Sequence, residues 1–224
     1  MIRSQFARVL EDALASDWDT VRRRLDAECA EFERSPDGAP PIVVQRLLVS
    51  GEDHRHARHP GFDLIAIGRA CWRRLSRGTH EGASTIEQQI VRVLTGRYER
   101  TLARKLREIL LATLVAQRYP KRCLPAVYLA IGYYGWRMNG YSQACRRLGL
   151  SMHSPSSDEA ARLVARLKYP QPRKASAHRE SQIERRAKHL RALYQRHLLD
   201  GTYRHLDGSA LRNRPTPLDP VPQS

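Results

Sequence analysis

The sequence has no apolar run long enough to cross a lipid bilayer. Its longest uncharged stretch lies between Arg122 and Arg137, contains Pro125 and two glycines, and falls short of the ~20 residues that a membrane-spanning helix needs. The first residues also lack the continuous apolar run of a secretory signal peptide. We therefore expect neither a transmembrane helix nor a signal peptide in this chain.

Acidic residues are scarce relative to basic ones. The 224 residues include 39 lysines and arginines but only 23 aspartates and glutamates, and the formal net charge is +16. Such a surface favours polyanions, which include nucleic acid, anionic lipid head groups and phosphate-bearing substrates. Charge alone does not choose among them. Because aromatic stacking motifs and recognised nucleic-acid-binding modules are absent from the sequence, we expect no specific nucleic-acid partner.

Cysteine is also sparse, and its spacing excludes two kinds of site. The four cysteines contain no CxxC pair, so zinc-ribbon spacing is absent, and a disulfide framework is not expected at this length. We expect buried, small hydrophobic side chains at Cys29, Cys71, Cys123 and Cys145.

Apolar residues recur at three- and four-residue steps, which predicts a mainly helical fold without strands or internal repeats. The predicted helices are one or two in 1–35, then 62–75, a helix after Ser84, 101–119, 124–131, 160–167 and 179–199. We expect three parts: a helical segment with a breaker-rich linker at 1–41, a domain at 42–200, and a disordered tail at 201–224. The sequence indicates no oligomeric state.

Two polar segments interrupt these helices. Residues 51–63 contain an acid pair and three histidines, and residues 81–92 contain a Ser-Thr step and a Gln-Gln step. Because buried polar groups need partners, such segments predict the two walls of a polar cleft. Ser84 is expected to cap the next helix, with Glu87 at capping-box spacing.

The acid pair of the first segment, Glu52 and Asp53, is followed by cationic and imidazole side chains. A carboxylate in such surroundings tends to have a lowered pKa and to stay ionised, which suits a base that removes a hydroxyl proton. The alternative is an ordinary acidic helix end that its basic neighbours neutralise.

His54, His56 and His59 also suggest a metal site. Zinc sites rarely lie among arginines, however, and Arg55 and Arg58 alternate with these histidines. We therefore expect a turn here and assign no metal ligands.

The predicted helix 101–119 carries a cationic cluster beside one acid. Arg100, Arg104 and Glu108 are spaced four residues apart, and Arg92 precedes them. Several charge-assisted hydrogen bonds could converge there on a pyrophosphate. The alternative is a solvated face with an ion pair worth a few tenths of a kcal/mol. The apolar stripe of this helix is predicted at Leu102, Leu106, Ile109, Leu110, Thr113 and Leu114.

Read in order, these segments resemble the peptidoglycan glycosyltransferase family, the transglycosylase module of class A penicillin-binding proteins and of monofunctional transglycosylases. Residues 52–61 (EDHRHARHPG) resemble the motif E-D-x-x-F-x-x-H-x-G, with His56 in place of Phe. Residues 82–92 (GASTIEQQIVR) resemble G-G-S-T-I-T-Q-Q-x-x-K, with Arg92 in place of Lys. Residues 104–108 (RKLRE) match R-K-x-x-E, and residues 123–130 (CLPAVYLA) resemble I-L-x-x-Y-L-N, with Ala130 in place of Asn. A weak fifth resemblance lies around 158–161, and the similarity covers roughly residues 42–195.

The resemblance implies an all-α, lysozyme-like large lobe with a small mobile jaw lobe. It also implies polymerisation of lipid II into glycan strands with loss of undecaprenyl pyrophosphate. Glu52 would be the base that deprotonates the acceptor sugar, and Glu108 would assist departure of the pyrophosphate through neighbouring cations or a divalent cation, Mg²⁺ or Mn²⁺. The substrate-binding residues carried over by position are Asp53, Ser84, Gln88, Gln89, Arg92, Arg100, Arg104 and Lys105.

The implied partners are lipid II, the growing glycan strand and an anionic membrane surface. We expect peripheral contact with the bacterial cytoplasmic membrane through surplus arginines and the apolar run from Leu124 to Trp136. The sequence does not decide the side of the membrane. Other hypotheses are a non-catalytic module that binds lipid II or anionic membrane, a nucleic-acid-binding protein and a peptidoglycan-lysing enzyme, although the Ser-Thr and Gln-Gln segment favours synthesis over lysis.

Overall fold

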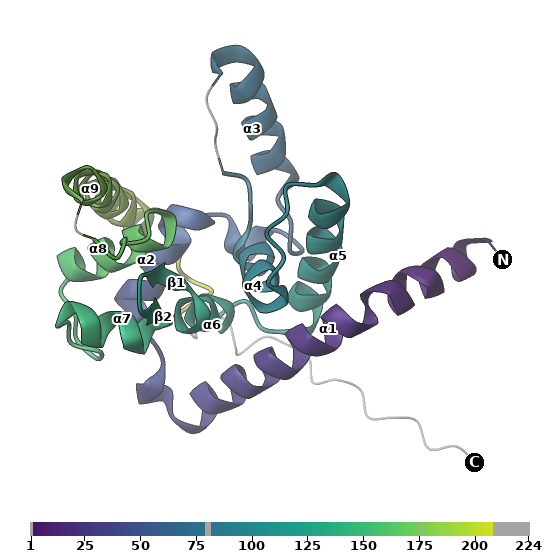
Figure 1. The fold of residues 1–224 in the computed structure, drawn as a ribbon, viewed down its shortest axis with the longest axis horizontal. Helices are drawn as coiled ribbons and strands as arrows, with labels where there is room; N and C mark the ends of the chain where they lie inside the picture. The colour runs from purple at the N-terminus through teal and green to yellow at the C-terminus, as the bar shows by residue number, and fades with distance from the viewer. Residues whose placement is uncertain (1, 79–81, 175, 208–224) are drawn as a thin grey trace.

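The computed structural model of the protein describes residues 2–78, 82–174 and 176–207, and its description of side chains begins at residue 14 and leaves out 71, 74, 75 and 77. These residues form a mainly helical structure, which confirms the predicted all-α fold class (Figure 1). The helices are α1 (Ile2–Arg34), α2 (Ile42–Glu52), α3 (Leu64–Arg77), α4 (Ile86–Thr95), α5 (Leu102–Arg118), α6 (Leu124–Ile131), α7 (Tyr141–Leu148), α8 (Ser157–Lys168) and α9 (Ala177–Leu199), with short 3-10 helices η1 (Pro36–Gly38) and η2 (His56–Arg58).

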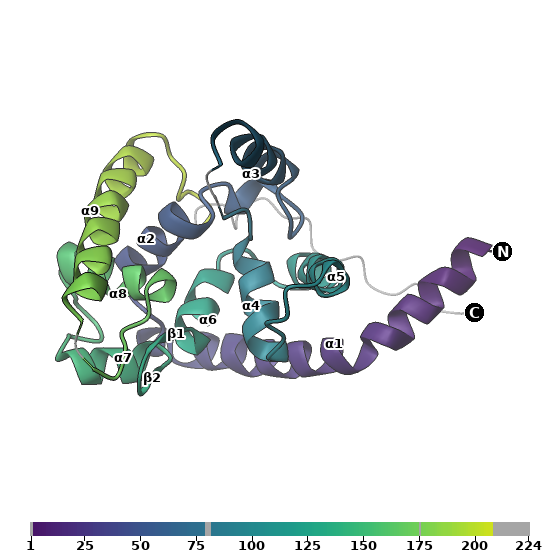
Figure 2. The ribbon, with the colours of Figure 1, turned by 45° about the horizontal axis from the view of Figure 1, so that its top comes forward.

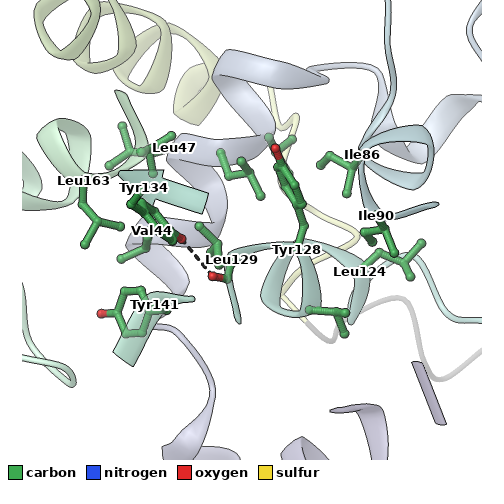
Figure 3. Close-up of a cluster of buried hydrophobic side chains, with 14 of the residues drawn as sticks. Val44, Leu47, Ile86, Ile90, Leu124, Tyr128, Leu129, Tyr134, Tyr141 and Leu163 are labelled. Atoms are coloured by element: carbon green, nitrogen blue, oxygen red, sulfur yellow. Dashed lines mark hydrogen bonds between the residues drawn. The ribbon is translucent and has the colours of Figure 1, made fainter. Parts of the chain in front are cut away.

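The core lies where α2, α4, α6 and α8 meet (Figure 3). Val44, Ile86 and Leu129 are fully buried there, and burial of one such side chain contributes roughly 1.5–3 kcal/mol. Tyr134 also reaches the core, and its hydroxyl donates a hydrogen bond to the Leu129 carbonyl at 2.9 Å. This packing fixes the direction of α2 and α4, the helices that adjoin the two polar segments.

The second half of α1 lies along α4, α5 and α6, and its N-terminal part extends beyond them (Figure 2). Val21 and Leu25 are fully buried, and Tyr119 donates a hydrogen bond from its hydroxyl to Asp26 at 2.6 Å. The segment predicted as a separate N-terminal part thus contributes to the same core as the rest of the chain.

A short hairpin corrects the expectation that the chain has no strand. β1 (Tyr133–Gly135) pairs antiparallel with β2 (Met138–Asn139), and Gln171 forms a further bridge to Gly135. These strands are too short to show an alternating pattern in the sequence, and Gly135 and Asn139 are residues typical of a loop.

The apolar run from Leu124 to Trp136, which was expected to contact the membrane, is largely buried, and Tyr133 is its exposed side chain. α6 buries Leu124, Val127 and Leu129 completely, and Tyr134 of β1 is also fully buried. Exposed apolar side chains lie on several elements, among them α3, α5, β1 and the end of α9. Leu64 and Trp72 of α3 are 69% and 71% exposed, and Leu102 of α5 is 90% exposed.

The buried face of α5 differs from the predicted apolar stripe. Leu102 and Leu106 are exposed, whereas Glu108, Leu111, Ala112 and Val115 are buried. The steps 108, 111, 112 and 115 follow the helical period, so the inward face of α5 begins with an acid. The sequence pattern assigned Glu108 to a polar face because it could not show that cationic side chains form hydrogen bonds with the buried carboxylate.

The described part of the predicted tail packs against the core. Tyr203 is 3% exposed, and its hydroxyl lies in hydrogen-bond contact with Ser50. Residues 208–224, the rest of the predicted tail, lie outside the described residues.

The cysteines are less uniformly buried than predicted. Cys145 is buried, whereas Cys29 and Cys123 are partly buried with their Sγ atoms 3.2 Å apart. The side chain of Cys71 lies outside the described residues.

Candidate active site

Glu52 is the last residue of α2 and lies at the edge of a polar cleft. Its side chain is 17% exposed. The buried residues of α2 end at Ser50, so Glu52 lies at the edge of the core. Oε2 accepts a hydrogen bond from Gln89 Nε2 at 3.0 Å, and Oε1 accepts one from Arg186 Nη2 at 3.1 Å. Each carboxylate oxygen retains a second lone pair. Glu52 can therefore accept a hydrogen bond or a proton from a molecule in the cleft.

α9 approaches α2 closely at Gly51 and directs Arg186 toward Glu52. A Cβ atom added at Gly51 would lie 2.3 Å from Cδ2 of Leu190, so a larger residue here would displace the side chains of α9. Arg186 Nη2 also donates to the Gly51 carbonyl at 2.7 Å. Two hydrogen bonds to adjacent residues thus hold the guanidinium beside the Glu52 carboxylate.

Asp53, predicted to bind substrate, turns away from the cleft. Its side chain is 4% exposed and accepts hydrogen bonds from His59 Nε2 at 2.9 Å and from the backbone N–H of Ile86 at 3.2 Å. Burial would raise the pKa of Asp53, but the adjacent imidazoles of His56 and His59 outweigh this effect and lower the pKa well below its usual value. Asp53 joins the two polar segments.

Gly61 fixes the end of the first segment against α5. Its φ is +101°, and an added Cβ would lie 2.3 Å from the Ala112 carbonyl oxygen. Thr85 Oγ1 donates a hydrogen bond to the Gly61 carbonyl at 2.7 Å. The start of the second segment is therefore also held against the first.

Thr85, not Ser84 as predicted, caps α4. Its Oγ1 accepts a hydrogen bond from the backbone N–H of Gln88. Ser84, one residue earlier, instead accepts hydrogen bonds from Arg92 at 3.3 Å and Lys105 at 3.2 Å. Because the cap lies one residue later, the Ser84 hydroxyl faces the cations.

Glu108 is the centre of the cationic cluster. Its carboxylate accepts hydrogen bonds from Arg92 through both oxygens, at 2.9 and 3.0 Å, and from Lys105 Nζ at 2.7 Å. Arg104 donates a further hydrogen bond to it. Burial would raise the pKa of Glu108, but the hydrogen bonds from Arg92 and Lys105 lower it below its usual value. Burial also lowers the pKa of Lys105, against the attraction of Glu108.

The structure brings Gln88 to this cluster but not Arg100. Gln88 is fully buried, and its Oε1 accepts a hydrogen bond from Lys105 Nζ at 2.6 Å. Arg100 is exposed in the loop before α5, and within the described residues no hydrogen bond or ion pair joins it to Glu108.

A cleft of about 1040 Å³ contains four of the predicted site residues: Glu52, Ser84, Gln89 and Arg92. It lies between α2, α3, α4, α8 and α9 (Figure 2). Its lining contains two carboxylates, Glu52 and Asp200, and six cationic side chains: Arg69, Arg73, Arg92, Lys168, Arg186 and Arg196. Glu108 does not line the cleft. It holds Arg92, which does line the cleft, through two hydrogen bonds. The cleft can therefore hold an anionic group within the same space as the Glu52 carboxylate.

The surroundings of Glu108 do not fit a directly bound divalent cation. Both of its carboxylate oxygens already accept hydrogen bonds from three cationic side chains. A metal ion there would meet their repulsion. A different cluster of the described residues has the donor atoms for a metal ion: Asp53, His56, His59 and Glu87, whose ligand atoms all lie within 4.8 Å of one another.

The sequence did not single out Arg186 or Tyr128, which complete the surroundings of Glu52. Arg186 is one of many basic residues in α9, and only the contact at Gly51 distinguishes it. Tyr128 of α6 donates a hydrogen bond to Gln89 Oε1 and so sets the orientation of the amide that contacts Glu52. The weak signal in the sequence was the position of Tyr128 within the fourth family-like motif.

Comparisons with known proteins identify the family of this chain. The model of the Transglycosylase family matches residues 24–194. The biosynthetic peptidoglycan transglycosylase of Thiobacillus denitrificans is 33% identical over 145 residues, which cover 64% of this chain and 62% of that protein. Penicillin-binding protein 1B of Escherichia coli K12 is 32% identical over 192 residues, which cover 79% of this chain and 23% of that protein.

A third relative, the monofunctional glycosyltransferase of Staphylococcus epidermidis, is 35% identical over 95 residues, 42% of this chain and 35% of that protein. The matched part of the chain thus spans less than two thirds of the length of these relatives. The family match includes both polar segments and the Glu108 cluster, and it extends over more than half of the sequence. The chain belongs to the Transglycosylase family.

Proposed function

We propose that this protein is a peptidoglycan glycosyltransferase that polymerises lipid II into glycan strands with release of undecaprenyl pyrophosphate. The observation that carries the proposal is the composition of the cleft, where Glu52 shares one space with Arg92 and five other cationic side chains. The names of the relatives, peptidoglycan transglycosylase and glycosyltransferase, support the same reaction class.

In the proposed reaction Glu52 acts as the general base. The 4-hydroxyl of the acceptor sugar transfers its proton to the Glu52 carboxylate as its oxygen attacks C1 of the donor sugar. The bond from C1 to the diphosphate oxygen breaks, and the diphosphate leaves with the electron pair. Gln89 and Arg186 hold Glu52 through one hydrogen bond each and leave its remaining lone pairs for the hydroxyl.

The Glu108 cluster would stabilise the departing diphosphate. Arg92 lines the cleft, and Ser84 beside it accepts hydrogen bonds from both Arg92 and Lys105. The negative charge that develops on the leaving oxygen is stabilised by positioned cations. Glu108 would assist by keeping Arg92, Arg104 and Lys105 together against their mutual repulsion, and this role needs no metal ion at Glu108.

We also propose peripheral contact with the anionic surface of the bacterial cytoplasmic membrane. Among the described residues, no helix is both long and apolar enough to span a membrane. The exposed Leu64, Trp72 and Leu102 could enter the head-group region, while the net charge of +16 attracts anionic lipid. The lipid-linked substrate would then reach the cleft from the surface that holds it.

A gel assay with lipid II tests the proposed reaction. The purified chain should yield glycan polymer, and Glu108→Gln should yield far less while retaining the helical circular dichroism of the parent. If no polymer forms under conditions in which a relative of known activity works, the reaction is wrong. If the inactive chain binds lipid II and Glu52→Gln leaves that binding unchanged, the chain is a non-catalytic binding module.

A further inference from the structure

A buried group of histidines and carboxylates lies behind the cleft, between the end of α2, η2 and the first turn of α4. It consists of Asp53, His56, His59 and Glu87, all less than 9% exposed. None of these side chains lines the cleft. We call these four residues the His56 cluster.

Two atoms of the cluster are buried without a hydrogen-bond partner: Nδ1 of His56 and Oε2 of Glu87. His56 Nε2 lies 3.0 Å from the Lys121 carbonyl oxygen, which can only accept, so Nε2 carries the hydrogen. In the neutral imidazole Nδ1 then has a lone pair. It faces Oδ2 of Asp53 and Oε1 of Glu87, each at 3.5 Å. A lone pair buried against two carboxylates is unfavourable, so Nδ1 must either bind a cation that lies between them or carry a proton itself.

The other contacts of the cluster separate ligands from supporting groups. His59 Nδ1 accepts a hydrogen bond from the Gly61 N–H, so its Nε2 carries a hydrogen and donates it to Asp53. His59 therefore orients Asp53 and is not a ligand. The Lys121 ammonium holds Oε1 of Glu87 and leaves Oε2 without a partner. Three donors remain: Asp53, His56 and Glu87.

The distances match the size of a small divalent ion. In a tetrahedral site with metal bonds of 2.0–2.2 Å, neighbouring ligand atoms lie about 3.4 Å apart. His56 Nδ1 lies 3.5 Å from Asp53 Oδ2 and 3.5 Å from Glu87 Oε1, the oxygen that Lys121 also contacts, and the ligand atoms of the cluster all lie within 4.8 Å of one another. One imidazole and two carboxylates suit Zn²⁺ better than Mg²⁺, which prefers oxygen ligands alone.

The arginines that argued against a metal site in this segment do not point into the cluster. Arg55 forms an ion pair with Asp63 at 2.8 Å, and Arg58 is exposed. His54, the third histidine of the segment, stacks on His197 instead, with ring centroids 5.7 Å apart.

We propose that Asp53, His56 and Glu87 bind one divalent transition-metal ion, for which Zn²⁺ is the best match. The ion would link the residue after Glu52 to the first turn of α4, which also carries Gln89. It would therefore be a structural ion that fixes the distance between the two walls of the cleft. None of these ligands is among the residues proposed to carry out glycosyl transfer.

Metal titration of the chelator-treated full chain tests the site. Native mass spectrometry should show one Zn²⁺ per chain, and Co²⁺ should give a visible absorption band at the same stoichiometry. His56→Phe and Glu87→Gln should weaken binding at least a hundredfold, since each removes a ligand. His59→Gln, which removes only the support of Asp53, should weaken it by about 10- to 100-fold. The matched control His54→Phe should bind as the parent does.

The melting temperature Tm is a second readout, and it separates a lost metal site from a failure to fold. Zn²⁺ should raise the Tm of the parent and of His54→Phe, because an ion that binds only the folded chain stabilises it, and should leave the Tm of Glu87→Gln unchanged. Absence of stoichiometric Zn²⁺ in the parent, or equal binding by folded His56→Phe, would overturn the proposal. So would ¹⁵N spectra showing both His56 nitrogens protonated in the presence of Zn²⁺, because the cation in the cluster would then be a proton.

Discussion

Gln89 Nε2 donates a hydrogen bond to Glu52 Oε2 at 3.0 Å, so the second polar segment directly holds the acid of the first. The orientation of the Gln89 amide is fixed by a second hydrogen bond, because its Oε1 atom accepts from the Tyr128 hydroxyl. The amide nitrogen must then face Glu52. Glu52 is thus oriented by groups from α4 and α9, and its function should depend on them.

Arg186→Met should lower the rate of glycan polymerisation by about 10- to 100-fold, because Glu52 loses one of its two positioning hydrogen bonds and the cleft loses a cation. The initial rate of lipid II consumption measures this effect. Arg185→Met removes the same charge from a neighbouring, exposed position and should change the rate less than twofold. Equal rates for the two variants would exclude a positioning role for Arg186.

Gly61→Ala should lower the free energy of unfolding by about 2–5 kcal/mol, because a side chain at φ +101° is strained and its Cβ would meet the Ala112 carbonyl at 2.3 Å. Urea denaturation followed by circular dichroism gives this value. Gly68→Ala is the matched control, since nothing lies within 4 Å of the added Cβ in α3. It should stabilise that helix by about 0.4–1 kcal/mol. Equal effects of the two substitutions would mean that Gly61 does not pack as described.

Glu108→Gln should lower the free energy of unfolding by about 1–3 kcal/mol near neutral pH, because three cations lose their charged acceptor. The folded-state pKa of Glu108 is lowered from 4.5, so its contribution is complete above the unfolded-state value and is lost as pH falls through the folded-state value. The difference between parent and variant should therefore shrink below about pH 4.5. Urea titrations at several pH values measure it, and a difference that grows at acid pH would contradict the assignment.

Trp72→Ser and Leu102→Ser should each weaken binding to vesicles that contain anionic lipid, because both remove an exposed apolar side chain. Vesicle co-sedimentation measures the bound fraction. Val127→Ala changes the buried α6 run and, in folded protein, should leave vesicle binding unchanged. If only that variant lost binding, the apolar run from Leu124 would be the membrane contact after all.

Much of the site was predictable because it is coded locally. The acid pair at the start of the first polar segment singled out Glu52, helical periodicity placed Gln89 on a helix, and the family-like motifs ordered them along the chain. The hairpin was missed because its strands have three and two residues. The inward face of α5 was missed because Glu108 is buried only with partners from other positions. Arg186 was missed because nothing in the sequence of α9 distinguishes one arginine from the next. Only the close contact between α9 and Gly51 in the fold singles out Arg186.

The His56 cluster shows the same limit. The sequence placed three histidines together with two arginines, and that composition argued against a metal ion. Only the fold shows that Arg55 pairs with Asp63 while His56 meets Glu87, which lies 31 residues further along the chain. The proposal of a metal site therefore rests on side-chain direction, which composition does not show.

The most direct test of the central claim is the rate of lipid II polymerisation by Glu52→Gln, measured beside the parent and the control Glu99→Gln. Glutamine keeps the size of the side chain but cannot take a proton, so the rate should fall by about 10²–10⁴-fold. Glu99 is exposed outside the cleft, and its variant should polymerise at the parent rate. Parent-like polymerisation by folded Glu52→Gln would contradict the assignment of Glu52 as the base.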